Sequence, residues 1–374
     1  MIQTASLTLL SLVCSAILAL SGLGSPLAVA HLAFAVGIVP LIFAAMMHFV
    51  PVLTRTGEPG KRLARLPSAA QATGLVVVAA MQGWLPYWLV YLAAAVDLVF
   101  AAILLQWIAL RVRATLGDPH PGWRWYATAL GCLMMALSAI VLIPVWPTYW
   151  QALRIFHLHL NTLGLIGLAA LGTLPVLLPT ALGLADPQAG VWLRRRLWLV
   201  ASGALMVATG AAISWPFAAP GTALILVASL GLLGQWGRRF GGWPLLRDGV
   251  SASLLAALVG LMITLAAGLL HGAGLIPTRP SLLAWASGFL MPLVSGALSQ
   301  LLPVWRWPGP QTPERLLMRR KLASSGSVRA GLFLSSSLAF LAELEVLGAG
   351  LVAFALLLFV IALLQAVRVT RSTR

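Results

Sequence analysis

Histidines are the residues of this sequence best suited to bind a ligand. The chain has six. Four of them fall inside or at the end of long apolar segments, where an ionisable side chain is costly and predicts a function. Because neutral imidazole is a ligand for haem iron and for metal ions, these four are candidate metal ligands. Hydrogen bonds between helices are the open alternative. The four are His31, His157, His159 and His271.

The spacing of His157 and His159 limits the chemistry that the pair can do. Positions i and i+2 of a regular helix point about 200° apart, so the two side chains cannot bind one metal ion together. They can instead face two cavities on opposite sides of their helix. His-x-His in a buried helix is therefore a more specific signal than two isolated histidines.

The other two histidines belong elsewhere. His48 lies 17 residues beyond His31, which is about 25 Å along a helix, so the two cannot share a site. His120 lies in the segment D-P-H-P-G, where we expect a solvated loop side chain. Asp97 is the only acid in the middle of an apolar segment. It is a weak candidate for a catalytic proton relay or for orienting a ligating histidine, and otherwise a carboxyl group hydrogen-bonded between helices.

The composition shows which elements must position these residues. Of 374 residues, 60% are hydrophobic and 9% are charged, whereas soluble domains have roughly 45–50% and 25%. This excludes a soluble enzyme, a disordered chain and a nucleic-acid-binding protein. Because a bilayer takes up the apolar segments, the formal charge of +16 indicates loop arginines that set topology. Two cysteines cannot form a disulfide framework.

A helix that crosses a bilayer needs about 20 mostly apolar residues. We count twelve such segments and predict an all-α integral membrane protein. The segments lie at about 3–22, 28–53, 68–84, 87–110, 124–145, 153–182, 197–217, 220–236, 249–271, 281–304, 326–342 and 346–367.

The basic residues predict the orientation. With twelve spans, one side of the membrane receives both termini and 22 of the 24 basic residues, Arg329 among them, and only Arg154 and Arg279 fall on the other side. We therefore expect both termini in the cytoplasm and the four candidate histidines in the outer third of the membrane. The segment at about 305–325 is expected to be a solvated basic linker against anionic lipid.

An internal repeat organises the chain. Pro40 to Gly57 reads P-L-I-F-A-A-M-M-H-F-V-P-V-L-T-R-T-G, and Pro292 to Gly309 reads P-L-V-S-G-A-L-S-Q-L-L-P-V-W-R-W-P-G, with the prolines, a valine and the last glycine in register. Gly172 to Gly183 is a looser copy. The corresponding prolines are Pro51, Pro175 and Pro303.

This spacing predicts one polytopic membrane domain, 1–374, built from three pseudo-repeated four-helix units. The repeats are expected at about 1–118, 119–245 and 246–374.

Two segments resemble haem–copper oxidase subunit I. His157-Leu158-His159, followed by Gly172, Pro179 and Gly183, resembles that family's tenth helix, which reads H-F-H and then a glycine, a proline and a glycine in the same register. The helix that begins near His31 is similar to the family's second helix. Its motif residues here are Pro40, Met47, His48 and Pro51. The likeness in architecture spans the chain, and the motifs cover about 50 residues.

The resemblance implies a site and a cofactor. His31 and His159 would be the axial ligands of a low-spin haem b, and His157 would be the ligand of a second haem or copper site. Arginine suits bidentate pairing with a propionate carboxylate, so Arg154 and Arg279, the two outer cations, are either propionate partners or ordinary interfacial residues. The chain lacks H-P-E-V-Y and an adjacent pair of histidines, which supply copper in the oxidases. It therefore resembles the divergent NnrS-like haem–copper membrane proteins linked to nitric oxide, and not a standard proton-pumping oxidase.

The expected function is haem-based redox chemistry or electron transfer in a bacterial inner membrane, with quinol or a periplasmic protein as electron donor. Whether the protein is an enzyme stays open. The alternative is a transporter or permease whose outer histidines bind a metal or cofactor in passage, and a further alternative is a haem-free structural subunit. A visible absorption spectrum separates the first from the other two, because only the first binds haem.

Overall fold

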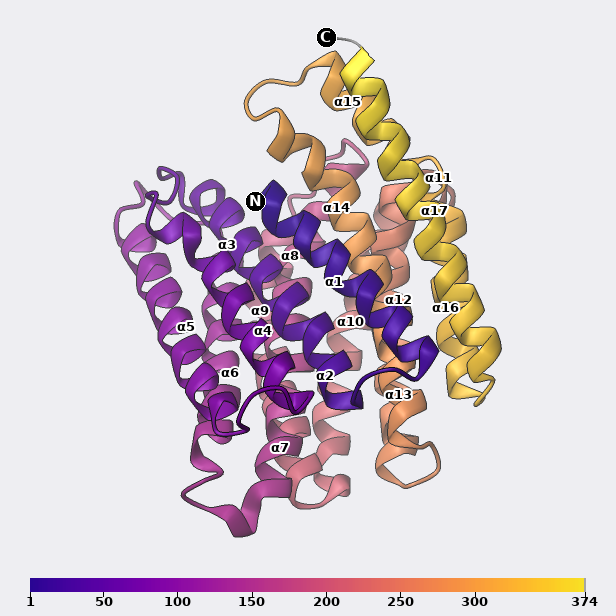
Figure 1. Ribbon diagram of the computed structural model, residues 1–374. Helices are drawn as coiled ribbons and strands as arrows, with labels where there is room; N and C mark the ends of the chain where they lie inside the picture. Colours follow the sequence, from indigo (N-terminus) through magenta and orange to yellow (C-terminus); the bar gives the residue numbers. More distant parts are fainter. Residues whose placement is uncertain (373–374) are drawn as a thin grey trace. The chain divides into compact units, whose positions relative to one another are not determined.

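The computed structural model describes residues 1–372, and these contain helices and loops but no β-strand (Figure 1). In chain order the helices are α1 (Ile2–Ser21), α2 (Pro26–His31), η1 (Leu32–Ile38), α3 (Val39–Thr54), η2 (Leu63–Arg65), α4 (Leu66–Met81), α5 (Leu89–Arg113), α6 (Gly122–Leu142), η3 (Pro147–Tyr149), α7 (Trp150–His159), η4 (Leu160–Gly167), α8 (Leu168–Ala181), α9 (Ala189–Ile213), η5 (Trp215–Phe217), α10 (Ala218–Phe240), α11 (Gly242–Arg247), α12 (Gly249–Gly272), α13 (Thr278–Trp285), η6 (Ala286–Leu290), α14 (Met291–Arg306), α15 (Pro313–Ala323), α16 (Gly326–Leu341) and α17 (Glu345–Ser372).

Eleven helical segments of residues 1–372 are long and apolar enough to cross a membrane. Three of them combine several helices end to end: Pro26–Thr54, Pro147–Ala181 and Thr278–Arg306. The protein therefore has the architecture of a multi-pass membrane protein. The expected span at 326–342 corresponds to α16, whose 16 residues reach about 24 Å and stop short of the roughly 30 Å hydrocarbon core.

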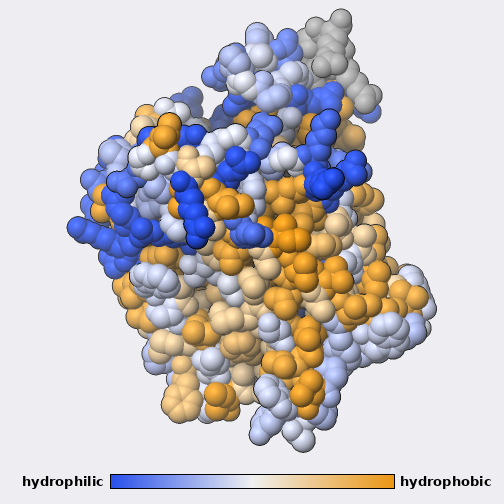
Figure 2. Space-filling model, turned by 90° about the vertical axis from the view of Figure 1, so that its left-hand side faces the viewer, coloured by the Kyte–Doolittle hydropathy of each residue, from blue (hydrophilic) through white to orange (hydrophobic). Residues whose placement is uncertain are grey.

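The surface of α5 shows how these helices meet lipid. Leu92, Val99, Ile103 and Leu110 are 50%, 55%, 40% and 55% exposed, and their spacing places them on one stripe of the helix. Figure 2 shows hydrophobic residues over most of one face of the molecule and hydrophilic residues gathered toward one end of it. An exposed apolar stripe of this length fits hydrocarbon and not water.

The chain divides into two compact units. One comprises residues 1–172 and 193–221, and the other comprises 173–192 together with 222 to the end of the described chain. Neither boundary coincides with the expected thirds of the sequence.

Three of the helices are π-helices, and they occur at regular intervals. The segments η1, η4 and η6 begin at residues 32, 160 and 286, spacings of 128 and 126. They lie in the same three segments that carry the proline motif. Counted from these starts, Pro51 and Pro179 lie 19 residues downstream and Pro303 lies 17 residues downstream. A π-helix is rare and commonly marks a functional position.

Side-chain donors stabilise the widened helix of η1. Its wider turns disturb the ordinary backbone ladder, and in an apolar setting freed carbonyl groups need other donors. Thr8 of α1 donates from Oγ1 to the carbonyl of Gly37 at 2.8 Å, and Gln71 of α4 donates from Nε2 to that of Val36 at 3.4 Å. The first unit thus holds the widened helix from two neighbouring helices.

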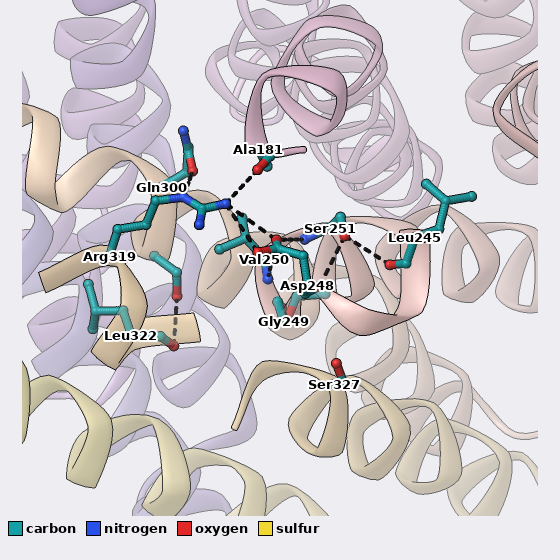
Figure 3. A network of polar contacts seen from close by, with 12 residues as sticks. Ala181, Leu245, Asp248, Gly249, Val250, Ser251, Gln300, Arg319, Leu322 and Ser327 are labelled. Carbon is teal, nitrogen blue, oxygen red and sulfur yellow. Dashed lines mark hydrogen bonds and ion pairs between the residues drawn. The ribbon is translucent and has the colours of Figure 1, made fainter. Parts of the chain in front are cut away.

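The second unit contains a polar network centred on Arg319 of α15 (Figure 3). Its guanidinium donates from Nε to Gln300 Oε1 at 2.8 Å and from Nη2 to the carbonyl of Ala181 at 2.5 Å. It also pairs with Asp248 at 3.2 Å, while the same carboxylate caps α12 by accepting from the amides of Val250 and Ser251.

One expectation about the basic residues is therefore wrong. The segment 305–325 is not a solvated linker throughout, because α15 buries Met318 and Leu322 and Arg319 ties it to three other helices. Arg329, counted with the loop cations, is fully buried. It donates to Ser325 Oγ and to the carbonyl of Leu322, and its guanidinium lies 5.0 Å from the ring centre of Phe359.

Candidate functional site

The histidines of the first unit stand directly before its π-helices. His31 is the last residue of α2 and precedes η1, and His159 is the last residue of α7 and precedes η4. Both are half-buried, as is His157. The residue directly before the π-helix is thus a histidine at both η1 and η4, and histidine can bind iron.

The four candidate histidines share one hydrogen-bonding pattern. In each, Nδ1 lies within hydrogen-bond distance of a backbone carbonyl oxygen, and because a carbonyl only accepts, Nδ1 carries the proton. The lone pair then resides on Nε2. This tautomer, with Nδ1–H held by a carbonyl, is the one that metal-ligating histidines commonly adopt. The Nδ1 partners and distances are His31 with Leu27 (2.7 Å), His157 with Ala136 (2.9 Å), His159 with Ile155 (2.9 Å) and His271 with Ile276 (2.8 Å).

His157 and His159 make their hydrogen bonds in different directions. His157 reaches across to the carbonyl of Ala136 on α6, whereas His159 bonds the carbonyl of Ile155, four residues earlier in its own helix. Asn161 lies beside the first of them, with Nδ2 at 3.3 Å and 3.4 Å from the two ring nitrogens. The two histidines thus have separate hydrogen-bonding surroundings, which agrees with their i, i+2 spacing.

A close packing contact brings α6 to this helix. A Cβ on Gly164 of η4 would lie 2.7 Å from the Cβ of Cys132 of α6, so only glycine allows the two helices to approach this closely. The approach places the Ala136 carbonyl within reach of His157. The sequence could not have pointed to Ala136, because it is the backbone carbonyl group of Ala136, and not its side chain, that accepts the hydrogen bond from His157.

Charge and aromatic surface surround the site. His31 and His157 are close enough to interact electrostatically with one another, and Arg154 interacts with both. The guanidinium of Arg154 also lies 5.0 Å from the ring centre of Trp150, a cation–π distance. The structure therefore brings together His31, His157 and Arg154, and Trp150 helps to hold the cation beside them.

The remaining site residues lie elsewhere. His271 belongs to the second unit, at the end of α12. Within residues 1–372, the hydrogen-bond partner of Asp97 is Thr73 of α4 and not a histidine. Over the same range, no three or more His, Cys, Asp or Glu side chains are grouped as around a metal ion, so the predicted set of four histidines does not form one such group.

His120 differs from the four candidates. It is half-buried and not solvated as expected. Its amide donates to the carbonyl of Leu53 at 2.9 Å, and its Nδ1 accepts from the amide of Gly122 at 3.3 Å. Burial and the positive charge of Arg194 lower the pKa of His120 below its ordinary value. A neutral ring with Nδ1 as acceptor holds a loop in place.

Comparison with known proteins finds no matching family model, no matching curated protein and no matching solved structure.

Proposed function

We propose that this protein binds a non-covalent haem b through His31 and His159 and functions in redox chemistry or electron transfer. The observation that supports it best is the shared tautomer. Each ring has its Nδ1–H on a backbone carbonyl, which orients the imidazole and leaves the lone pair on Nε2 for iron. The position of each histidine before a π-helix supports the pairing.

The neighbouring residues have roles in this proposal. His157 is the ligand of a second haem or copper site, since its Nδ1 is held by α6 and its ring is flanked by Asn161. Arg154, the cation that interacts with His31 and His157, pairs with a propionate. A bound haem supplies one-electron redox chemistry, while the protein sets its ligands and polarity.

The architecture that we propose for the site has twelve spans in three four-helix units, similar to haem–copper oxidase subunit I, with α16 as the eleventh span. The regular spacing of the three π-helices supports the repeat. The positive charge of the loops supports a bacterial inner membrane with both termini in the cytoplasm and the haem in the outer third. Quinol or a periplasmic protein would donate electrons.

The test is the visible absorption spectrum of the detergent-purified protein after expression with a haem precursor. Bis-histidine haem gives a sharp Soret band and resolved visible bands in the reduced state. His31→Ala and His159→Ala are expected to abolish this spectrum, and His157→Ala to spare it. His120→Ala is the matched control. A colourless folded protein supports the transporter, and a His31→Ala protein with the full spectrum contradicts the pairing.

A further inference from the structure

Asp97 is an acid within a candidate span and is not used by the haem proposal. It lies eight residues after Leu89, where α5 begins, which is about 12 Å along the helix. Its side chain is half-buried. The exposed stripe of α5 is apolar on both sides of Asp97, from Leu92 to Leu110. We therefore place the Asp97 carboxyl group within the depth of the membrane.

One hydroxyl group is the partner of this carboxyl among the described residues. Thr73 Oγ1 of α4 lies 2.5 Å from Asp97 Oδ1 and 2.9 Å from the carbonyl oxygen of Ala70. Both distances are those of hydrogen bonds. The hydroxyl has a single proton, however, and so it can donate to only one of these two oxygens.

The proton of the hydroxyl group can go to either oxygen. If Thr73 donates to Asp97, the Ala70 carbonyl loses this second donor, and Asp97 is either a carboxylate with one hydrogen bond or an acid whose Oδ2 proton has no hydrogen-bond acceptor among the described residues. If Thr73 donates to Ala70, the short contact needs a proton from Asp97, and the carboxyl group is neutral. The second arrangement satisfies both contacts.

The surroundings of Asp97 favour the neutral acid. The helices packed against α5 are α3, α4 and α6, and α4 contains no charged residue. Arg111 of α5 lies 14 residues further along the helix, about 21 Å away. Within residues 1–372 Asp97 makes no ion pair, and an unpaired carboxylate at this depth would cost several kcal/mol. The remaining titratable or charged groups of these helices are His48 on α3, Arg124, Tyr126 and Cys132 on α6, and Tyr91 and Arg113 on α5.

Asp186 shows the opposite solution in the same protein. Its side chain is 1% exposed, yet Arg239 Nε lies 3.4 Å from one carboxylate oxygen and Gln235 Nε2 donates to the other at 3.0 Å. This buried carboxyl group has a cation and a second donor beside it. Asp97 has neither.

We propose that Asp97 is a protonated carboxyl group at neutral pH, and that Asp97 and Thr73 form an intramembrane site that binds and exchanges one proton with the aqueous phase at the Leu89 end of α5. Protonation converts the carboxylate and a hydronium ion into the carboxylic acid and water. Deprotonation reverses this, and Thr73 then turns its hydroxyl from Ala70 to the carboxylate. The site is independent of haem binding.

Infrared difference spectroscopy of the purified protein tests the charge state. At neutral pH, the wild-type minus Asp97→Asn spectrum is expected to contain the C=O stretching band of a protonated carboxyl group. Asp186→Asn is the matched control and is expected to lack this band, showing carboxylate bands instead. Carboxylate bands for Asp97 would overturn the proposal. The isosteric amide keeps the Thr73 contact, and size-exclusion elution confirms folding.

Two further measurements test the pair and the exchange. Thr73→Val removes the acceptor of the acid proton, so the band is expected to move to higher frequency without loss, while Thr73→Ser keeps its position. In D2O the wild-type band is expected to move to lower frequency. An unchanged position in Thr73→Val contradicts the pairing, and a band insensitive to D2O contradicts proton exchange.

Discussion

The π-helices of the two units are preceded by different residues. His31 and His159 precede η1 and η4, whereas Trp285 precedes η6. Trp285 is 7% exposed and packs edge-on against Phe289. Around η6, a Cβ on Gly288 would lie 2.5 Å from Ser337 Oγ. The third π-helix is therefore filled by packing, while the first two hold half-buried imidazoles.

The difference teaches what the π-helix does in each place. At η1 and η6, side chains of other helices donate to carbonyls in or beside the widened helix: Thr8 and Gln71 at η1, and Ser337 to the carbonyl of Ala284 at 3.0 Å at η6. The device itself is thus independent of the residue before it. A histidine there offers a ligand, and a tryptophan there fills space.

The largest effect is expected when the residue before a π-helix is replaced by alanine, either Trp285 before η6 or His31 before η1. Trp285→Ala leaves a large cavity and is expected to cost about 3–5 kcal/mol of unfolding free energy while the haem spectrum of surviving protein stays unchanged. His31→Ala is expected to remove that spectrum with a much smaller loss of stability. Thermal unfolding and absorption spectra measure both. A Trp285→Ala protein that is stable but lacks haem would contradict the assignment of Trp285 to packing and of His31 to haem binding.

The close packing of η6 makes a second prediction. A Cβ on Gly260 of α12 would overlap the carbonyl of Gly288, whereas a Cβ on Gly268 of the same helix meets open space. Gly260→Ala is expected to destabilise the protein by about 1–3 kcal/mol through overpacking, and Gly268→Ala to be neutral or stabilising. Equal melting temperatures for the two variants would contradict close packing of Gly260 against Gly288.

A smaller effect is expected where η1 receives its donor. Thr8→Val keeps the shape of the side chain but leaves the Gly37 carbonyl without its 2.8 Å hydrogen bond. Such bonds within membranes are worth about 0.6 kcal/mol on average, and the expected loss is of this order. The control is Thr209→Val, since Thr209 bonds only carbonyls of its own helix. Identical unfolding curves for the two variants argue against support from α1.

The smallest effect concerns pH and His120. Because the pKa of His120 is lowered in the folded protein by burial and by Arg194, the unfolded chain binds more protons below about pH 6.5. The contribution of His120 to stability is therefore complete above that pH and declines as the pH falls. His120→Gln is expected to flatten the dependence of melting temperature on pH, and a wild-type slope in this variant contradicts the assignment.

Most of the fold could be predicted because each membrane-spanning helix satisfies the hydrogen-bonding groups of its own backbone. A run of about 20 apolar residues in a membrane has to be helical, whatever its neighbours are. Each expected segment therefore corresponds to a helix within several residues. The exception is α15, because its basic sequence predicted a solvated linker and the structure has a packed helix there. The helix has a local start signal, because Thr312 caps its N-terminus and Pro313 is its first residue. Its docking through Arg319 onto Asp248, 71 positions away in the chain, is what no local pattern encodes.

The sequence by itself determined the membrane class, the positions of the spans and the placement of His31 and His159 near the ends of apolar segments. Hydrophobicity and residue spacing are local properties, and they suffice for this. Only the tertiary structure decided that His157 donates to Ala136, that Thr73 faces Asp97 and that three helices widen into π-helices. The two side-chain contacts depend on one helix approaching another closely enough to supply a donor or an acceptor, as do the donors that reach η1 and η6 from other helices. That approach is set by packing between distant segments.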